Sequence, residues 1–164
     1  NGEYDFSLIR HFLYDTEEVI RFEMLSQSSF QPLSDLSKKI RAELRYHTLH
    51  ANTWMKQLGS ATEESIARLQ KSLNTTIPFA LGMFEESPYE KELITTGIFG
   101  GEQALKEEWM KKVEEVIGQT NLTLPDWKIV QPVFGGRTGK HSEHLQPLLD
   151  EMSEVFRIDP SAEW

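Results

Sequence analysis

Apolar residues recur every three or four positions along most of this chain, and a glycine or proline separates one run from the next. The clearest run comprises Leu145, Leu148, Leu149, Met152, Val155 and Phe156. Another comprises Leu105, Trp109, Val113 and Val116. Because this spacing places apolar side chains on one face of an α-helix, it favours helices over strands. Only residues 127–133 have a strand-like pattern, so the sequence predicts an all-α fold.

The joints between these runs set the expected helix boundaries. The predicted helices cover residues 4 to 26 or 27, 32–58, 61–86, 88–97, 102–117 and 142–157, and residues 119–140 are irregular. Gly59 is expected to end the second helix in a left-handed conformation, and Ser60 with Glu63 to form a capping box for the third. Pro78 is expected to kink the third helix. The first two helices are joined by a short turn and must pack antiparallel.

Length and composition limit the classes of protein that fit. The whole chain, residues 1–164, is expected to form a single helical domain. It has no cysteine, which excludes disulfides, thiolate metal sites and a cysteine nucleophile. The net charge of −9 argues against nucleic-acid binding, which needs a basic surface. No apolar run approaches the roughly 18 residues of a membrane-spanning helix, and the polar start is unlike a secretory signal. We therefore expect a cytoplasmic protein that binds neither nucleic acid nor membrane.

Three ionisable residues interrupt the apolar faces of the first two predicted helices. Asp15 lies on a face with Leu8, Phe12, Val19 and Phe22. Glu43 and His47, one helical turn apart, lie on a face that also holds Leu33, Leu36, Ile40, Ala51, Trp54 and Leu58. In an antiparallel pair, Asp15 and Glu43 are equidistant from the connecting turn. We therefore expect them at the same depth, with Glu43 and His47 largely buried.

Two interpretations of this inward polar cluster are open. Buried carboxylates need compensation, and helix bundles build divalent or di-iron centres from inward Glu and Glu-x-x-His sets. Here Tyr46 stands three residues after Glu43, where that motif needs histidine, and one helix pair supplies too few ligands. The alternative is a structural network with basic groups such as Lys39 or Arg45. We predict the structural network and no bound metal.

A glycine-rich stretch, Gly135 to Lys140, leads into the last predicted helix. Arg137 and Lys140, with the backbone amides there, could hold an anion or contact a partner. The stretch is not a phosphate-binding Walker loop, which needs a different residue order. His141 and His144 could bind a metal ion or the same partner, but a structural or interface role is the simpler interpretation. The sequence shows no nucleophile–base arrangement, and we assign no catalytic residue.

Three stretches together resemble a known family, the C subunits of the bacterial phenylacetyl-CoA epoxidase, a multicomponent oxygenase. They are residues 9–15 (IRHFLYD), residues 41–47 (RAELRYH) with 58–65 (LGSATEES), and residues 135–145 (GGRTGKHSEHL). The last residues, 159–164 (DPSAEW), are also similar to the end of that family. The resemblance spans nearly the whole chain, although residues 88–99 depart from the family pattern.

The resemblance implies a ferritin-like helical bundle, here expected to lack its N-terminal helices. In this family the A subunit holds the di-iron centre, and the C subunit is its relative with a degenerate site. The expected function is that of a structural, non-catalytic subunit of the oxygenase that epoxidises the ring of phenylacetyl-CoA in aerobic phenylacetate degradation. Asp15, Glu43 and His47 would then mark a vestigial metal site. The chain itself would carry no cofactor.

The expected partners are the catalytic A subunit, with phenylacetyl-CoA bound at the complex, and further copies of this chain when it is alone. The exposed side of the first helix pair is the predicted interface, because the second helix cannot cover all the apolar residues of the first. Two rival functions stay open. A self-sufficient di-iron oxidase or oxygenase would need more converging carboxylates and histidines than these. A free-standing helical binding module for an unrelated ligand would need no oxygenase partner.

Overall fold

The computed structural model describes residues 2–162, and all regular elements in that range are helices. They are α1 (Tyr4–Leu25), α2 (Gln31–Leu58), α3 (Glu63–Gly82), α4 (Glu90–Thr95), α5 (Glu102–Ile117), the 3-10 helix η1 (Gly136–Thr138), α6 (Leu145–Met152) and α7 (Glu154–Ile158). The all-α prediction is confirmed, and the strand-like stretch at 127–133 is irregular. Within residues 2–162, no helix has the length and apolar character that crossing a membrane requires.

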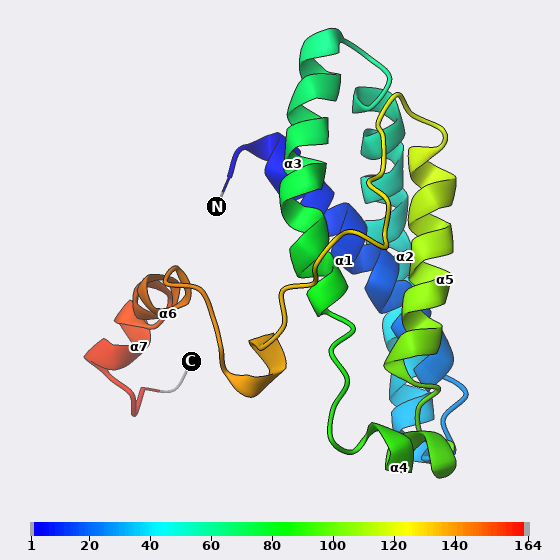
Figure 1. The fold of residues 1–164 in the computed structure, drawn as a ribbon. Coiled ribbons are helices and arrows are strands. Elements are labelled where there is room, and N and C mark those ends of the chain that lie inside the picture. The colour runs from blue at the N-terminus through cyan, green and yellow to red at the C-terminus, as the bar shows by residue number, and fades with distance from the viewer. Residues whose placement is uncertain (1, 163–164) are drawn as a thin grey trace.

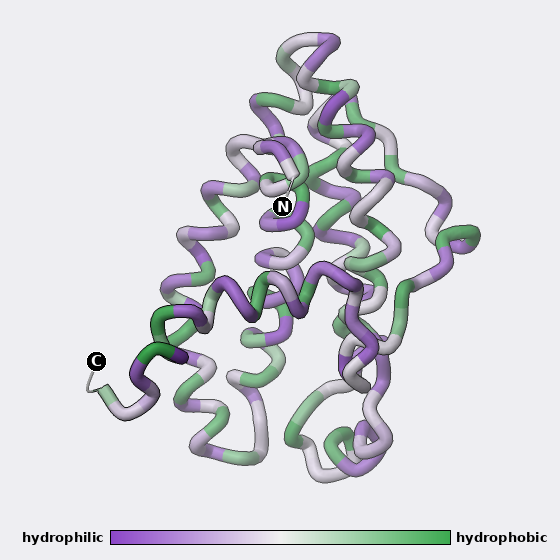
Figure 2. Tube along the Cα trace, turned by 90° about the vertical axis from the view of Figure 1, so that its left-hand side faces the viewer, coloured by the Kyte–Doolittle hydropathy of each residue, from purple (hydrophilic) through white to green (hydrophobic). Residues whose placement is uncertain are grey.

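Helix α1 is the central element of the bundle. It packs antiparallel against α2, as predicted, and also contacts α3 and α5 (Figure 1). Its buried side chains therefore face several neighbours, and Ile9, Phe12 and Leu13 have almost no exposed surface. Hydrophobic and hydrophilic residues alternate along the helices in Figure 2, as expected where each helix buries only part of its circumference.

The core closes around Trp109 on α5. Its ring is fully buried, with the rings of Phe84 and Trp127 at centroid distances of 5.2 and 5.7 Å. The Trp109 Nε1–H donates to the carbonyl oxygen of Leu13 at 2.9 Å. A buried indole needs such an acceptor, and here the acceptor is the backbone of α1. This hydrogen bond therefore joins α5 to the central helix, and the predicted core position of Trp109 is confirmed.

The irregular segment between α5 and η1 runs back along α3 (Figure 1). The Asn121 N–H donates to the Gly59 carbonyl, and the Val133 N–H donates to the Pro78 carbonyl, both at 2.9 Å. Beside the second contact, a Cβ on Gly82 would lie only 2.1 Å from the Val133 oxygen. Glycine at position 82 therefore allows this segment to lie directly on the backbone of α3.

The junction between α2 and α3 differs from the prediction. The N-cap of α3 is Thr62: its Oγ1 accepts the Ser65 N–H, and the Ser65 Oγ accepts the Thr62 N–H, both at 3.1 Å. The capping box predicted at Ser60 and Glu63 therefore lies two residues too early. The prediction required a carboxylate as the second member of the box, but the Ser65 hydroxyl accepts that hydrogen bond instead. Gly59 ends α2 with a right-handed φ of −70°, so the predicted left-handed cap is wrong.

Later helix ends also differ from the prediction. Helix α3 continues through Pro78 and ends at Gly82 instead of residue 86. Beyond it the carboxylate of Glu85 accepts the Gly135 N–H at 2.8 Å, an interaction that spacing along the chain does not reveal. Helix α4 is shorter than the predicted 88–97, and Gly97 follows it with a φ of +71°.

Residues 145–158, the C-terminal arm, stand apart from the bundle (Figure 1). The arm contains α6 and α7, which pack against each other, and neither helix has a buried residue. The predicted single helix over 142–157 is wrong, because it starts later and is interrupted at Ser153. That residue ends α6 and precedes α7, and its Oγ donates to the Leu149 carbonyl. The apolar spacing correctly indicated helices in this segment. It also implied that their apolar face packs against the bundle, but neither helix has a buried residue.

The contact at Gly82 gives a first prediction. Gly82→Ala should destabilise the bundle by about 1–3 kcal/mol, because the added methyl collides with the Val133 carbonyl. The intrinsic preference of a helix for alanine over glycine, about 0.5–1 kcal/mol, acts in the opposite direction. Urea unfolding followed by circular dichroism measures the difference. Gly136→Ala is the control, because a Cβ there meets nothing within 4 Å; equal stabilities of the two variants would contradict the close contact.

Candidate functional site

Asp15 on α1 is the one member of the predicted polar cluster that is buried, with 7% of its surface exposed. Its carboxylate lies 3.8 Å from His11 Nδ1, one turn earlier on the same helix. Burial raises the pKa of Asp15, and the charges of His11, His47 and His50 act to lower it. His47 and His50 of α2 are therefore near enough to influence Asp15 through their charge, and the expected common depth of Asp15 and Glu43 stays a prediction.

The expected burial of Glu43 and His47 is wrong, because both side chains are exposed, as is Trp54. The error is one of helical phase. The buried face of α2 consists of Ser34, Ser37, Leu44, Ala51 and Met55. These residues recur at steps of three, four and seven, but several are too small or polar to register in an apolar pattern. Small side chains allow α1 and α2 to approach closely, and Ser34 Oγ donates to the Ser26 carbonyl at 2.7 Å.

Because of that phase, a polar face lies open along the α1–α2 pair. Its exposed members are His11, Glu43, His47, His50 and Trp54, and the buried Asp15 adjoins them. The residues do not fit a metal centre as they stand: within residues 2–162 no group of three or more His, Asp or Glu side chains could hold an ion. Tyr46, the residue at the histidine position of a Glu-x-x-His motif, is 71% exposed. We derive no metal chemistry from this face.

The largest charged cluster was missed by the sequence analysis. Arg21 on α1 forms a two-pronged hydrogen bond with Glu102 of α5, at 2.9 and 2.8 Å, and a third bond with Glu17 at 2.5 Å. Both carboxylates are buried, with 4% of the surface of Glu17 and 2% of that of Glu102 exposed. The guanidinium carbon also lies 5.4 Å from the ring centre of Phe99. The Glu17–Arg21 pair, four residues apart in α1, could be seen in the sequence. The pairing of Arg21 with Glu102 could not, because Glu102 is far away along the chain.

The Arg21 guanidinium therefore contacts both buried carboxylates. Burial raises the pKa of Glu17 by more than Arg21 lowers it, and the nearby charge of Glu102 raises it further. Burial alone would lower the pKa of Arg21, but its hydrogen bonds with Glu102 and the charges of both carboxylates raise it overall. The guanidinium therefore stays charged, and the ion cluster links α1 to α5.

A third buried carboxylate extends the cluster toward α4. Oε1 of Glu90 accepts the backbone N–H of Glu102 at 2.6 Å, which satisfies one free donor at the start of α5. Oε2 of Glu90 is buried without a hydrogen-bond partner among the described residues. Acidic side chains at this position also interact favourably with the helix dipole of α5.

The glycine-rich stretch is attached to the same cluster. Arg137 of η1 forms an ion pair with Glu102 Oε1, with the nitrogen and oxygen 2.8 Å apart, and donates a hydrogen bond to the Met83 carbonyl at 3.0 Å. Gly135, with a φ of +112°, turns the chain so that its carbonyl accepts the N–H groups of Thr138 and Lys140. The Arg137 guanidinium therefore anchors the stretch to the bundle, which supports the structural interpretation for this residue.

The other predicted contact residues, Lys140, His141 and His144, are exposed between this anchor and the C-terminal arm. Their proposed contact with an anion or a partner stays a prediction. A cleft of about 600 Å³ lies elsewhere, between α1, α2 and α5, and is lined in part by Thr16, Asn52 and Val116. No residue of the open polar face lines it.

The apolar surface expected to remain open on α1 is smaller than predicted. Leu8 and Phe12 are buried, and Val19 and Phe22 are half-buried, because α3 and α5 cover what α2 does not. The larger exposed apolar side chains lie instead on α2, including Leu36, Tyr46 and Leu49, and on the C-terminal arm.

Comparison with known proteins supplies the biological context for this architecture. Over residues 1–164 the chain matches the family described as "Phenylacetic acid catabolic protein". It is 29% identical over 164 residues to a protein of Escherichia coli (strain K12) that is named as the C subunit of 1,2-phenylacetyl-CoA epoxidase. The alignment covers 100% of this chain and 65% of that relative, so the chain spans slightly less than two thirds of the relative's length.

The Arg21 cluster gives a second prediction. Arg21→Met should cost about 3–5 kcal/mol of unfolding free energy at neutral pH, because buried Glu17 loses its guanidinium and buried Glu102 retains only that of Arg137. The cost should shrink on acidification, since a carboxylate whose pKa is raised in the folded state destabilises that state only once it ionises. Urea unfolding at pH 7 and pH 5 measures both effects. Lys111→Met is the control: its exposed pair with Glu108 should contribute no more than about 1 kcal/mol.

Asp15 gives a third prediction. Because its pKa is raised by burial, ionised Asp15 favours the unfolded chain, so Asp15→Asn should stabilise the protein at pH 8. Toward pH 4 the gain should fall, because Asp15 is then protonated in the folded state and the buried charge is gone. Thermal unfolding at the two pH values measures the change. Glu43→Ala, at an exposed position, should change the unfolding free energy by no more than about 0.5 kcal/mol at both pH values. An equal stabilisation by Asp15→Asn at both pH values would contradict this explanation.

Proposed function

Because this chain belongs to the phenylacetic acid catabolic protein family, as its motifs predicted, we propose that it is a subunit of a phenylacetyl-CoA epoxidase. The observation that carries the proposal is the alignment of the entire chain with a relative named as the C subunit of that enzyme. In this proposal the complex epoxidises the aromatic ring of phenylacetyl-CoA during phenylacetate catabolism, and it works in the cytoplasm.

We propose further that this subunit is structural and not catalytic. A bundle that holds two iron ions supplies a Glu from each of two helices and a Glu-x-x-His motif from each of two others. Here Tyr46 occupies the histidine position, and Glu43 and His47 face outward on the open polar face, which the buried Asp15 adjoins. These residues would be the vestige of a metal site, and the iron would be held by a catalytic A subunit.

The open face of the α1–α2 pair is the proposed contact for that partner. It carries carboxylate and histidine side chains and an exposed aromatic ring, Trp54, which lies edge-on to His50. Aromatic residues are enriched at protein interfaces because one end is apolar and the other forms hydrogen bonds. Obligate interfaces between subunits bury roughly 2,000 Å² or more, which a helix pair of this length can supply.

The fourth prediction tests the subunit role and the iron assignment together. When this chain is co-expressed with a catalytic A subunit, the two should purify as one complex, and iron should follow the A subunit after the two are separated. The measurements are sedimentation for the complex and metal analysis for each chain. About two irons per copy of this chain would overturn the non-catalytic role. If the chain does not bind the A subunit at micromolar concentration, the proposed partnership is wrong.

A further inference from the structure

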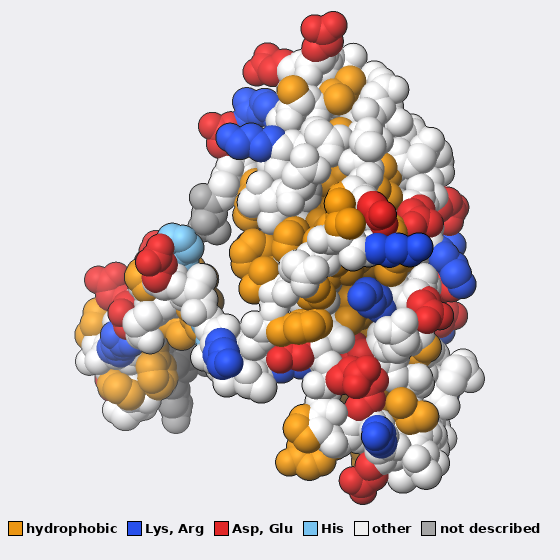
Figure 3. All heavy atoms as spheres, in the orientation of Figure 1, with side chains coloured by type: hydrophobic (Ala, Val, Ile, Leu, Met, Phe, Trp, Pro, Cys, Tyr) orange, Lys and Arg blue, Asp and Glu red, His pale blue; other side chains and the backbone are white. Residues whose placement is uncertain are grey.

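The C-terminal arm, residues 145–158, presents an apolar surface that the bundle does not cover. Leu148, Leu149, Met152, Val155, Phe156 and Ile158 are between 43% and 80% exposed. Figure 3 shows hydrophobic side chains grouped with acidic ones on the arm, away from the bundle. Soluble proteins rarely leave a contiguous apolar patch of this kind free, so the arm is built to dock on another surface.

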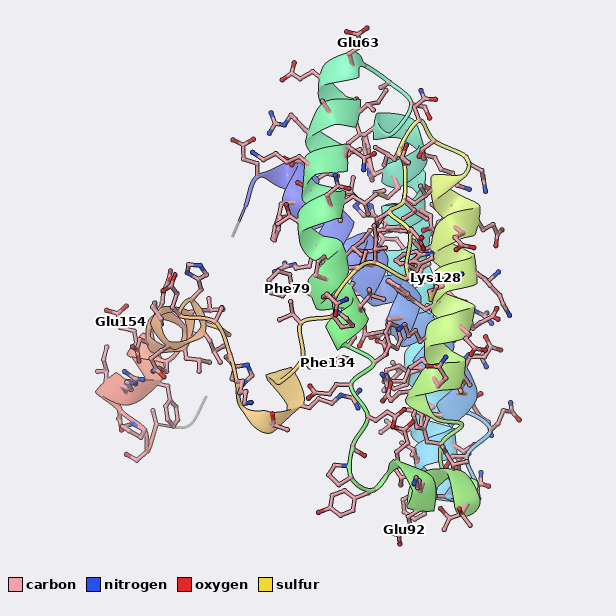
Figure 4. All side chains as sticks on the ribbon, viewed as in Figure 1. Glu63, Phe79, Glu92, Lys128, Phe134 and Glu154 are labelled. Carbon is pink, nitrogen blue, oxygen red and sulfur yellow. The ribbon has the colours of Figure 1, made fainter. Side chains whose placement is uncertain are left out.

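The base of the arm is held firmly. Arg137 ties η1 to the buried Glu102, and Glu85 accepts the Gly135 N–H, so the residues just before the arm are fixed to α3 and α5. In Figure 4 the arm, marked by Glu154, lies on the far side of α3, marked by Phe79, from α5. The arm therefore follows an anchored stretch at residues 135–137, and Tyr46 and Leu49 of its own α2 remain exposed.

The arm carries an acidic rim. Asp150, Glu151 and Glu154 stand against a single basic residue, Arg157. Asp150 is already neutralised by Arg157 at 2.8 Å, an interaction that lowers the pKa of Asp150. Glu151 and Glu154 form no ion pair with any described residue and are exposed. The surface that fits this arm is thus apolar at its centre and basic at its edge.

One exposed surface of this chain has that character: the outer face of α2, formed by Lys39, Arg45, Tyr46, Leu49 and Lys56. Tyr46 and Leu49 are 71% and 66% exposed and lie one turn apart. Lys39 precedes Tyr46 by seven residues, and Lys56 follows Leu49 by seven, so the cations flank the apolar pair on the same side. None of the three cations pairs with an acidic residue within the described range.

From this complementarity we propose that the C-terminal arm of one copy docks on the outer face of α2 of a second copy. The arm's apolar side chains cover Tyr46 and Leu49, while Glu151 and Glu154 meet the free cations of α2. Exchange of two arms in this way closes a symmetric dimer, because each copy offers both surfaces once. The proposal needs only the surfaces of this chain and does not depend on the reaction that the complex catalyses.

The chain has no cysteine, so cysteine pairs can test the contact without background. Met152→Cys in one copy and Leu49→Cys in a second, tagged copy should form a mixed disulfide on mild oxidation, several-fold more than Met152→Cys with Lys111→Cys. Lys111 is the matched control because it is exposed on α5, away from the outer face of α2. Equal yields from the two mixtures would overturn the proposal.

A chain that carries both Met152→Cys and Leu49→Cys distinguishes an arm that docks on a second copy from an arm that folds back onto its own α2. The expected product is a disulfide between two copies, and a disulfide closed within one copy would overturn the proposal. Sedimentation supplies a second test: the unmodified chain should be dimeric at micromolar concentration, and Met152→Glu should make it monomeric without loss of helix content by circular dichroism, since no residue of α6 or α7 is buried within one copy. A monomeric unmodified chain, or a Met152→Glu chain that remains dimeric, would overturn it. A cross-link that forms only to an added A subunit would also do so.

Discussion

The interaction on which the described structure depends is the ion cluster around Arg21. Its guanidinium joins Glu17 of α1 to Glu102 of α5, and the same Glu102 is reached by Arg137 from η1. Glu90 of α4 binds the Glu102 backbone N–H. Buried charges are tolerated only when they are paired and hydrogen-bonded, so these elements can take only the few arrangements that keep every charge paired. The cluster thereby orders the end of the bundle from which the C-terminal arm leaves.

The other end of the fold combines close packing with an ion pair between Arg68 of α3 and Asp5 of α1. Helix α1 lies against α2 through small residues, against α3 through leucines and against α5 through Trp109. A central helix that is covered on several sides explains why it buries residues, such as Thr16 and Asp15, that an amphipathic pattern would place outside. Thr16 resolves its burial locally, by donating to the Phe12 carbonyl at 2.6 Å. The Asp15 carboxylate instead faces His11, one turn earlier on the same helix, at 3.8 Å.

The surface of this chain offers two kinds of contact. The open polar face of the α1–α2 pair combines histidines, carboxylates and an aromatic ring, a composition suited to a partner that brings its own polar groups. The outer face of α2 and the C-terminal arm are simpler, with apolar centres and rims of opposite charge. Opposite rims guide association and fix its register more than they add affinity, while the apolar centres supply most of the stability. A subunit with both surfaces can bind a catalytic partner and a second copy through separate contacts.

The sequence by itself determined the helices, their order and the family. The three- and four-residue period, the turn between α1 and α2 and the position of α5 all follow from local preferences and glycine or proline breaks, which the chain carries at each position. The burial of Trp109 and the absence of a Glu-x-x-His motif were also visible there. Only the tertiary structure decided which face of α2 is buried, because small serines and an alanine, which carry no hydrophobic signal, form that contact. It also decided that Arg21 pairs with Glu102 and Arg137 with the same carboxylate, since attraction between charges depends on distance in space. For the same reason the arm's apolar period could indicate helices but could not show that the bundle leaves them uncovered.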